Sequence, residues 1–198
     1  MRDDRFAGWR RDARLAFPRV AWLQHVNAVV VLTLLVHVGW LVLLERSLVC
    51  PCGVVELWQS RPDAARNSQQ FADAYSLLHI AFGSGLCLAS TWIRPNWPVV
   101  DRALLAMISS TAWEMVENTP VVIAMLNNAA NAAPDYHGDS VLNSLADTAF
   151  ALSGFAIATR LPLRWTIGLV LLLELTATAL VEDGFVLIVW RLAAGLQT

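Results

Sequence analysis

Acidic, amide, hydroxyl and imidazole side chains occur at helical spacing inside stretches of this chain that are otherwise apolar. Three groups have members three or four residues apart, so that a helix would place each group on one face: Asp139, Asn143 and Asp147; Glu114 and Glu117; Ser76 and His79. Carboxylates suit Mg, Ca or Mn, and one imidazole also admits Zn or Fe. A carboxyl group with a raised pKa beside a histidine can instead serve as an acid or base.

Three roles follow from these chemistries. The residues that we assign to them are, in turn, the metal ligands His79, Glu117 and Asp139; the catalytic acids or bases Glu114, Glu117 and Asp147; and the substrate-binding residues Asp73, Ser76 and Asn143. The alternative is that these groups bond one another and merely hold the helices together, which interhelical polar contacts do at roughly 0.6–2 kcal/mol each. The presence of four neighbouring carboxylates favours a functional site, because they cannot all ionise without a cation, a basic partner or bound protons. These four are Glu114, Glu117, Asp139 and Asp147.

The elements that must position these residues are long apolar stretches. Hydrophobic residues make up 57% of the chain, and its mean hydropathy is +0.52. A run of about 18 apolar residues is long enough to cross a bilayer. We predict an all-α integral membrane protein of one domain (1–198), a bundle of five transmembrane helices: 26–44, 74–92, 103–126, 140–158 and 165–181. The glycines in "FGSG" and "LSGF" are predicted to permit close helix packing.

The last apolar piece, 185–196, has only 12 residues and contains Arg191. It is too short to cross a bilayer of ordinary thickness, so we predict an interfacial or re-entrant C-terminal helix. A six-span alternative stays open, in which this piece crosses a thinned bilayer.

The arginines predict the orientation. All 14 basic residues are arginine, and the five-span topology puts ten on the side of the N-terminus and four on the other side. Cytoplasmic loops carry the excess of positive charge. We therefore predict a multi-pass protein of a bacterial inner membrane, with a cytoplasmic arm (1–25) and two outer loops (45–73 and 127–139). Its environment is the lipid bilayer, and a net charge of −2 gives no indication of nucleic acid.

This topology brings the polar groups of the second, third and fourth spans to matching heights, in a pocket that opens outward. His137 has the right height to join that pocket, whereas His25 and His37 of the first span are predicted to be packing or interface residues away from it. In the first outer loop, Pro51 separates Cys50 from Cys52. The two thiols could form a strained, easily reduced disulfide, bind a soft metal, or stay reduced or separately modified.

Four segments together resemble a family of alphaproteobacterial inner-membrane proteins of unknown function. They are "CPCG", "NSQQ…DAYSLLHIAFG", "AWEMVENTP" and "DYHGDSVLNSLADTAFALSGFAIATRLPL", in the order of the family and spread over about residues 50–183. The family tends to have a second histidine three residues after His79, where this chain has Phe82. The spacing Asp-x5-His, Glu, Asp-x3-Asn is more distantly similar to the VanZ-like membrane proteins, which implies a role at the cell envelope.

The sequence therefore predicts a periplasm-facing carboxylate and histidine pocket that binds a divalent metal or a polar lipid headgroup and performs envelope-related chemistry. Whether the protein is an enzyme, and which metal it holds, stay open. The alternative is a non-catalytic accessory subunit or assembly factor of a larger membrane complex, respiratory or photosynthetic. The loss of the second histidine at Phe82 favours that alternative, because a degenerate site tolerates such a loss.

Overall fold

The computed structural model describes residues 20–59, 63–127, 135–187 and 190. The cytoplasmic arm expected over 1–25 and the C-terminal piece expected over 185–196 lie largely outside the described residues. The helices are α1 (Val20–Leu43), α2 (Tyr75–Ile93), α3 (Val99–Glu117), α4 (Pro120–Asn127), α5 (Val141–Ala158) and α6 (Leu163–Val181). No strand occurs in the described part of the chain. The all-α prediction is confirmed.

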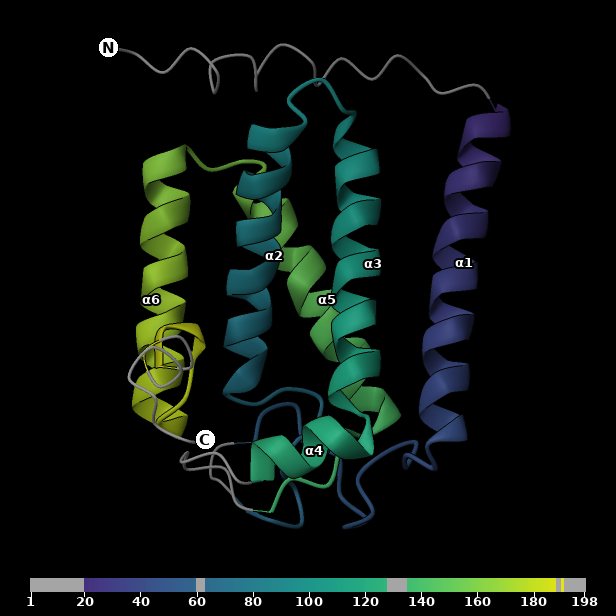
Figure 1. Cartoon of the computed structure of the whole chain (residues 1–198), viewed down its shortest axis with the longest axis vertical. Coiled ribbons are helices and arrows are strands. Elements are labelled where there is room, and N and C mark those ends of the chain that lie inside the picture. The colour runs from purple at the N-terminus through teal and green to yellow at the C-terminus, as the bar shows by residue number, and fades with distance from the viewer. Residues whose placement is uncertain (1–19, 60–62, 128–134, 188–189, 191–198) are drawn as a thin grey trace.

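Five helices run side by side, while α4 lies across one end of the bundle beside the loops after α1 and before α5 (Figure 1). In that arrangement α2 and α5 make the closest pair, α6 packs on α2, and α3 lies between α1 and α5. We call the end that carries α4 the loop end. Both α2 and α5 begin there, so the two central helices run in the same direction.

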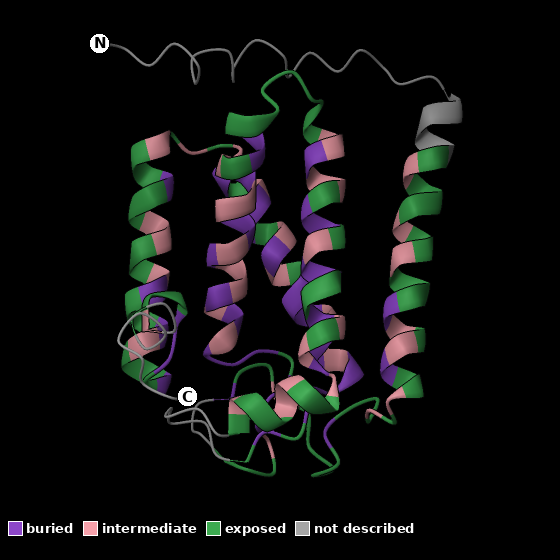
Figure 2. Ribbon diagram, viewed as in Figure 1, coloured by how far each residue is buried: buried purple, intermediate pink, exposed green. Residues whose placement is uncertain are grey.

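Four helices are long and apolar enough to cross a membrane: α1, α2, α5 and α6. Helix α3 equals α2 in length but carries four charged residues, and it is not one of those four. Buried positions gather on the central helices, whereas α1 and α6 expose apolar side chains over much of their length (Figure 2). On α1, Leu32 and Leu35 are more than 60% exposed. An apolar surface of this kind suits contact with lipid.

The predicted third span, 103–126, is wrong at its outer end. Helix α3 ends at Glu117, and Asn118 closes it by donating its backbone and side-chain N–H groups to the carbonyl of Glu114. Pro120 then begins α4, in the first-turn position where a missing N–H costs nothing. The residue before a proline is disfavoured in helical conformation, so the helix breaks at Thr119 and the chain turns across the loop end.

Glycine lets α2 and α5 approach to backbone contact. A Cβ atom on Gly83 would lie 1.7 Å from the carbonyl oxygen of Ala151, and a Cβ atom on Gly154 would lie 2.0 Å from the carbonyl oxygen of Ile80. Ser84 adds a hydrogen bond across the same contact, from Oγ to the Gly154 carbonyl at 3.1 Å. The prediction that the glycines permit close packing is confirmed for these two positions.

We expect Gly83→Ala to lower the free energy of unfolding by about 1–3 kcal/mol, because the added methyl group forces the two backbones apart. Thermal unfolding of the detergent-solubilised protein, followed by circular dichroism, measures this effect. Gly85→Ala is the matched control on the same helix, since nothing lies within 4 Å of a Cβ atom there. Equal stability of the two variants would contradict the role of Gly83.

Candidate functional site

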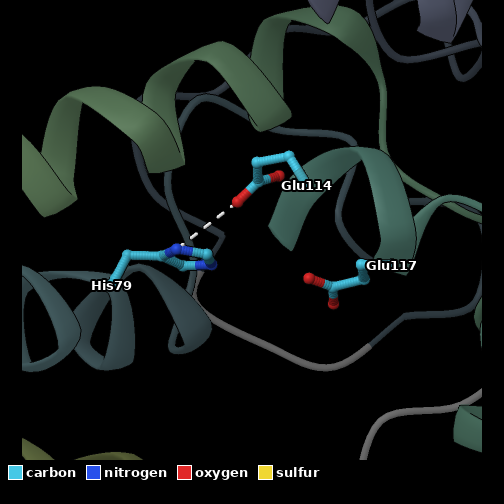
Figure 3. Close-up of side chains that lie close together, drawn as sticks. All are labelled: His79, Glu114 and Glu117. Carbon is cyan, nitrogen blue, oxygen red and sulfur yellow. Dashed lines mark ion pairs between the residues drawn. The ribbon is translucent and has the colours of Figure 1, made fainter. Parts of the chain in front are cut away.

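The polar residues of three helices meet near the loop end of the bundle. His79 lies in the second turn of α2, Glu114 and Glu117 lie in the last turn of α3, and Asp147 lies in the second turn of α5. Figure 3 shows the imidazole of His79 and the carboxylate of Glu117 directed toward one space beside Glu114. The prediction that separate helices supply polar groups at matching heights is borne out for these four residues.

His79 lies between two carboxylates that come from different helices. Its Nδ1 is 3.4 Å from Glu114 Oε1, and its Nε2 is 3.7 Å from Asp147 Oδ2. One ligand atom from each of His79, Glu114 and Glu117 can be chosen so that all three lie within 4.8 Å of one another. Glu114 is 1% exposed and the side chain of His79 is 11% exposed. These three residues are the candidate metal ligands, and we call them the metal cluster. They form a compact donor set in which Glu114 is buried and His79 and Glu117 are partly exposed.

Glu114 and Asp147, the two carboxylates on either side of His79, each accept a hydrogen bond from a serine hydroxyl. Ser144 Oγ donates to Glu114 Oε2, and Ser76 Oγ donates to Asp147 Oδ1, both at 2.8 Å. The other oxygen of Glu114, Oε1, is buried without a hydrogen-bond partner among the described residues. It faces His79, so it is free to accept a cation together with the imidazole.

Helix α1 also reaches the cluster, through His37. This residue is fully buried, and its Nε2 lies 2.8 Å from Ser144 Oγ. Ser144 has one hydroxyl proton and donates it to Glu114 Oε2, so in this arrangement His37 Nε2 carries the N–H that donates to Ser144. The prediction that His37 lies away from the cluster is wrong. Its only sequence signal was a costly polar group in an apolar span.

Further contacts tie the loop end to α1 and α3. Trp40 Nε1 donates to the Met115 carbonyl at 2.8 Å. Arg46 Nη2 donates to the Asn118 carbonyl at 2.9 Å, and its Nη1 donates to the carbonyl of His137. These bonds hold the end of α3 against the loop that precedes α5.

Asp139 lies beside the cluster, not in the metal donor set. Tyr136 donates its hydroxyl to Asp139 Oδ1 at 2.9 Å, and the Asn118 amide donates to Oδ2. The backbone N–H of Asp139 donates back to Asn118 Oδ1 at 2.8 Å. Both carboxylate oxygens are thus occupied by protein donors, and Glu114 takes the place in the donor set that the sequence suggested for Asp139.

The predicted substrate-binding residues also bond within the protein. Asp73 Oδ1 accepts the N–H groups of Tyr75 and Ser76, which caps the start of α2. Asn143 Nδ2 donates to the Gln70 carbonyl at 2.9 Å. Two oxygens, Asp73 Oδ2 and Asn143 Oδ1, are buried without a hydrogen-bond partner among the described residues. A role in substrate binding stays a prediction for both residues.

The acidic groups around the cluster, which we call its rim, are Asp73, Asp139 and Tyr136, and all three have raised pKa values. Burial raises the pKa of Asp139 to about 6, and the negative charge of Asp73 adds to the rise, while Asn118, Tyr136 and Arg46 oppose it. Burial likewise raises the pKa of Asp73. The pKa of the Tyr136 hydroxyl is also raised, by burial first and then by Asp139 and Glu117. This rim favours a cation or bound protons.

An open cavity of about 390 Å³ lies on the loop side of Asp139. Its wall includes Arg46, Cys52, Asn67, Gln69, His137 and Asp139. His137, which the sequence placed at the height of the site, is exposed and lines this cavity, and it does not join the metal cluster. Asp139 is therefore the residue through which the cavity and the rim of the cluster meet.

The structure is that of an all-helical protein in which four helices are suited to spanning a membrane and a carboxylate and histidine cluster lies near one end of the bundle. A family model described as "Protein of unknown function (DUF2585)" matches residues 41–197, and the chain belongs to this family. The resemblance to an alphaproteobacterial family is confirmed.

Three relatives illustrate the similarity, each called a UPF0314 protein. The one from Brucella anthropi is 37% identical over 163 residues, 82% of each chain. The one from Rhizobium meliloti is 37% identical over 156 residues, 77% of this chain and 79% of the relative. The one from Sphingopyxis alaskensis is 34% identical over 181 residues, 90% and 92% of the two chains. No solved structure matches the chain significantly. None of these matches bears on the VanZ-like resemblance.

We expect the stability of the metal-free protein to fall as the pH rises from 4 to 7, and Asp139→Asn to remove part of that fall. A folded pKa near 6, above the ordinary value of 3.8, means that the folded state keeps a proton that the unfolded state releases. The stabilisation is therefore complete below about pH 4 and is lost as the pH rises through 6. Two pKa units correspond to about 3 kcal/mol.

Thermal unfolding in detergent with a chelator, at several pH values, measures the difference between Asp139→Asn and the wild type. Arg46, Asp73, Glu117 and Tyr136 surround the carboxyl group and stay unchanged. Asp135→Asn, at an exposed carboxylate of the same loop, should keep the wild-type pH dependence. Parallel curves for wild type and Asp139→Asn would show that this group does not titrate in that range.

Proposed function

We propose that this protein binds a divalent cation with His79, Glu114 and Glu117, in a pocket that faces the periplasm. The observation that carries the proposal is the compact donor set, three ligand atoms within 4.8 Å, in which the buried Oε1 of Glu114 faces His79 and has no hydrogen-bond partner in the described part of the chain. Two carboxylates and one imidazole suit Mn, Fe or Zn, and Mg when water completes the coordination.

The surplus of buried acids supports a cation over simple helix contacts. Asp73, Asp139 and Asp147 are each 5% exposed or less, and all three lie close to the metal cluster. Arg46 is the one arginine near them in the described part of the chain, and both of its terminal nitrogens donate to carbonyl groups. Buried carboxylates without a counter-charge must stay protonated or bind a metal ion.

In this proposal Asp147 does not bind the cation but holds the imidazole of His79 in place. His79 would hold the cation through Nδ1, the ring nitrogen next to Glu114, and would donate its Nε2–H to Asp147. Carboxylates that accept the outer N–H of a metal-bound histidine fix its tautomer and raise its basicity. The histidine that the family tends to have at the position of Phe82 is not needed, because Glu114 completes the donor set of three.

The membrane orientation is part of the proposal. Helix α3 is a fifth span whose charged residues Glu114 and Glu117 point into the bundle, and whose Arg102 is buried at the opposite end against Thr91. Five spans with the arginine excess on the N-terminal side put the N-terminus in the cytoplasm and the loop end in the periplasm of the inner membrane. The cavity beside Asp139 then admits a polar group, such as a lipid phosphate, that the cation attracts.

A second candidate is a non-catalytic subunit of a larger membrane complex. The loop end exposes apolar side chains beyond the spans, among them Leu57 at 81% and Val121 at 71%. Such a surface is typical of contacts with other proteins or with the bilayer surface. Stable co-purification with other subunits through a mild detergent, with no bound metal, would favour this candidate.

We expect the purified protein to bind close to one equivalent of divalent metal. The variants His79→Ala and Glu114→Gln should lose it, because each removes one of three ligands. Equilibrium dialysis against Mn²⁺, Zn²⁺ and Mg²⁺, followed by metal analysis by mass spectrometry, measures binding. Glu174→Gln is the matched control, a buried glutamate of α6 outside the cluster whose oxygen accepts the Val186 N–H, a bond that glutamine can keep. Equal metal content in wild type and both cluster variants would overturn the proposal.

His37 should orient Glu114 for the metal. We expect His37→Leu to weaken metal binding by about 10–100-fold, the usual effect of losing a residue that orients a metal ligand. His37→Gln should bind close to wild type, because its amide can supply the N–H to Ser144. Leu41→Ala controls for packing, since Leu41 is fully buried one turn further along α1. Leu41→Ala should lower the unfolding temperature without changing the affinity for metal. If it weakened metal binding as much as His37→Leu does, the effect of His37 would be one of packing alone.

A further inference from the structure

The segment Cys50-Pro51-Cys52 holds a chemical group that the metal cluster does not use. The two cysteines form a disulfide bond in the loop after α1. We propose that this disulfide is a thiol–disulfide exchange site, whose substrate is a thiol, either a small molecule or a cysteine of another protein. The proposal is independent of metal binding.

The two sulfur atoms differ in access. Cys52 is exposed and forms part of the wall of the 390 Å³ cavity, next to Pro51, Ala64 and Ala65. Cys50 is only 3% exposed, and its Sγ lies 3.7 Å from the Ala65 carbonyl oxygen. An incoming thiolate therefore reaches the sulfur of Cys52, with Cys50 as the leaving group.

The backbone supports that leaving group. The N–H of Cys52 donates to Cys50 Sγ at 3.3 Å, so a hydrogen bond is already in place for the negative charge that develops there. Attack by R–S⁻ forms a bond from R–S to Cys52 and breaks the Cys50–Cys52 bond, whose electron pair goes to Cys50. A second thiolate then attacks the R sulfur, releases R–S–S–R and leaves two cysteine thiolates, which take up protons. Two electrons pass from two thiols to the disulfide.

The loop does not depend on the disulfide for its shape. The bond closes a ring around one residue, and so short a ring removes little entropy from the unfolded chain. The backbone of the loop is held elsewhere, by hydrogen bonds from Val141 N to the Ser47 carbonyl at 2.8 Å and from Leu142 N to the Leu48 carbonyl at 3.1 Å. A disulfide with so small a structural effect can open and close while the protein stays folded.

The test uses the full chain in detergent, on a Cys87→Ala background that leaves this pair as the only cysteines. Glutathione buffers of stepped ratio set the redox state, and a maleimide that adds mass reports free thiols on a gel. We expect reduction at ratios that leave ordinary structural disulfides intact, with an unchanged unfolding temperature. A pair that stays oxidised in excess dithiothreitol, or a fold that melts on reduction, would overturn the proposal.

Single-cysteine variants test which of the two sulfur atoms a small thiol reagent can reach. With oxidised glutathione, Cys50→Ser should form a mixed disulfide at Cys52 many times faster than Cys52→Ser forms one at Cys50, because Cys50 is buried. Equal rates would remove Cys52 as the point of attack. Loss of metal binding in the cluster variants would not affect either result, so the two proposals fail separately.

Discussion

The contact between the backbones of α2 and α5 is the constraint on which the site depends. Gly83 and Gly154 remove the side chains that would keep these helices apart, and Ser84 bonds across the gap. Both helices begin at the loop end, so a contact fixed in the middle of the pair also fixes the register of their first turns. The bond between Ser76 and Asp147 is a consequence of that register, as is the position of His79 beside Asp147.

Helices α3 and α1 complete the site around this pair: α3 supplies two carboxylates, and α1 supplies polar contacts. Helix α3 ends at Glu117 because Asn118 and Pro120 stop it, and this places Glu114 and Glu117 at the height of His79. His37 and Trp40 of α1, and Arg46 of the loop that follows it, each make a polar contact to the end of α3 or to α5. A polar contact inside an apolar bundle is costly to leave unmade, so three of them specify where α1 lies.

Burial and charge act against one another at the loop end. The packing that excludes water also deprives Asp73, Asp139 and their neighbours of the solvent that would stabilise their charge. A protein gains nothing in stability from such a group of acids, because apolar residues of similar volume would pack at lower cost. Their concentration at one end, beside an open cavity, is the arrangement expected of a site that takes up cations or protons.

Local periodicity in the sequence determined the helical class, most helix positions and the helix faces of Glu114, Asp147 and His79, because spacing along one helix depends only on its own geometry. The predicted third span ran on to 126, past Pro120, where the structure begins a separate helix. The sequence did not determine which faces meet. The link between His37 and Ser144 exists only because α1 packs beside α5. The spacing predicted one helical stripe for Asp139 and Asp147, yet α5 begins after Asp139, at Val141. Asn118 and Tyr136 occupy the oxygens of Asp139, while Glu114 faces His79. Those partners come from other segments, so only the tertiary structure decided them.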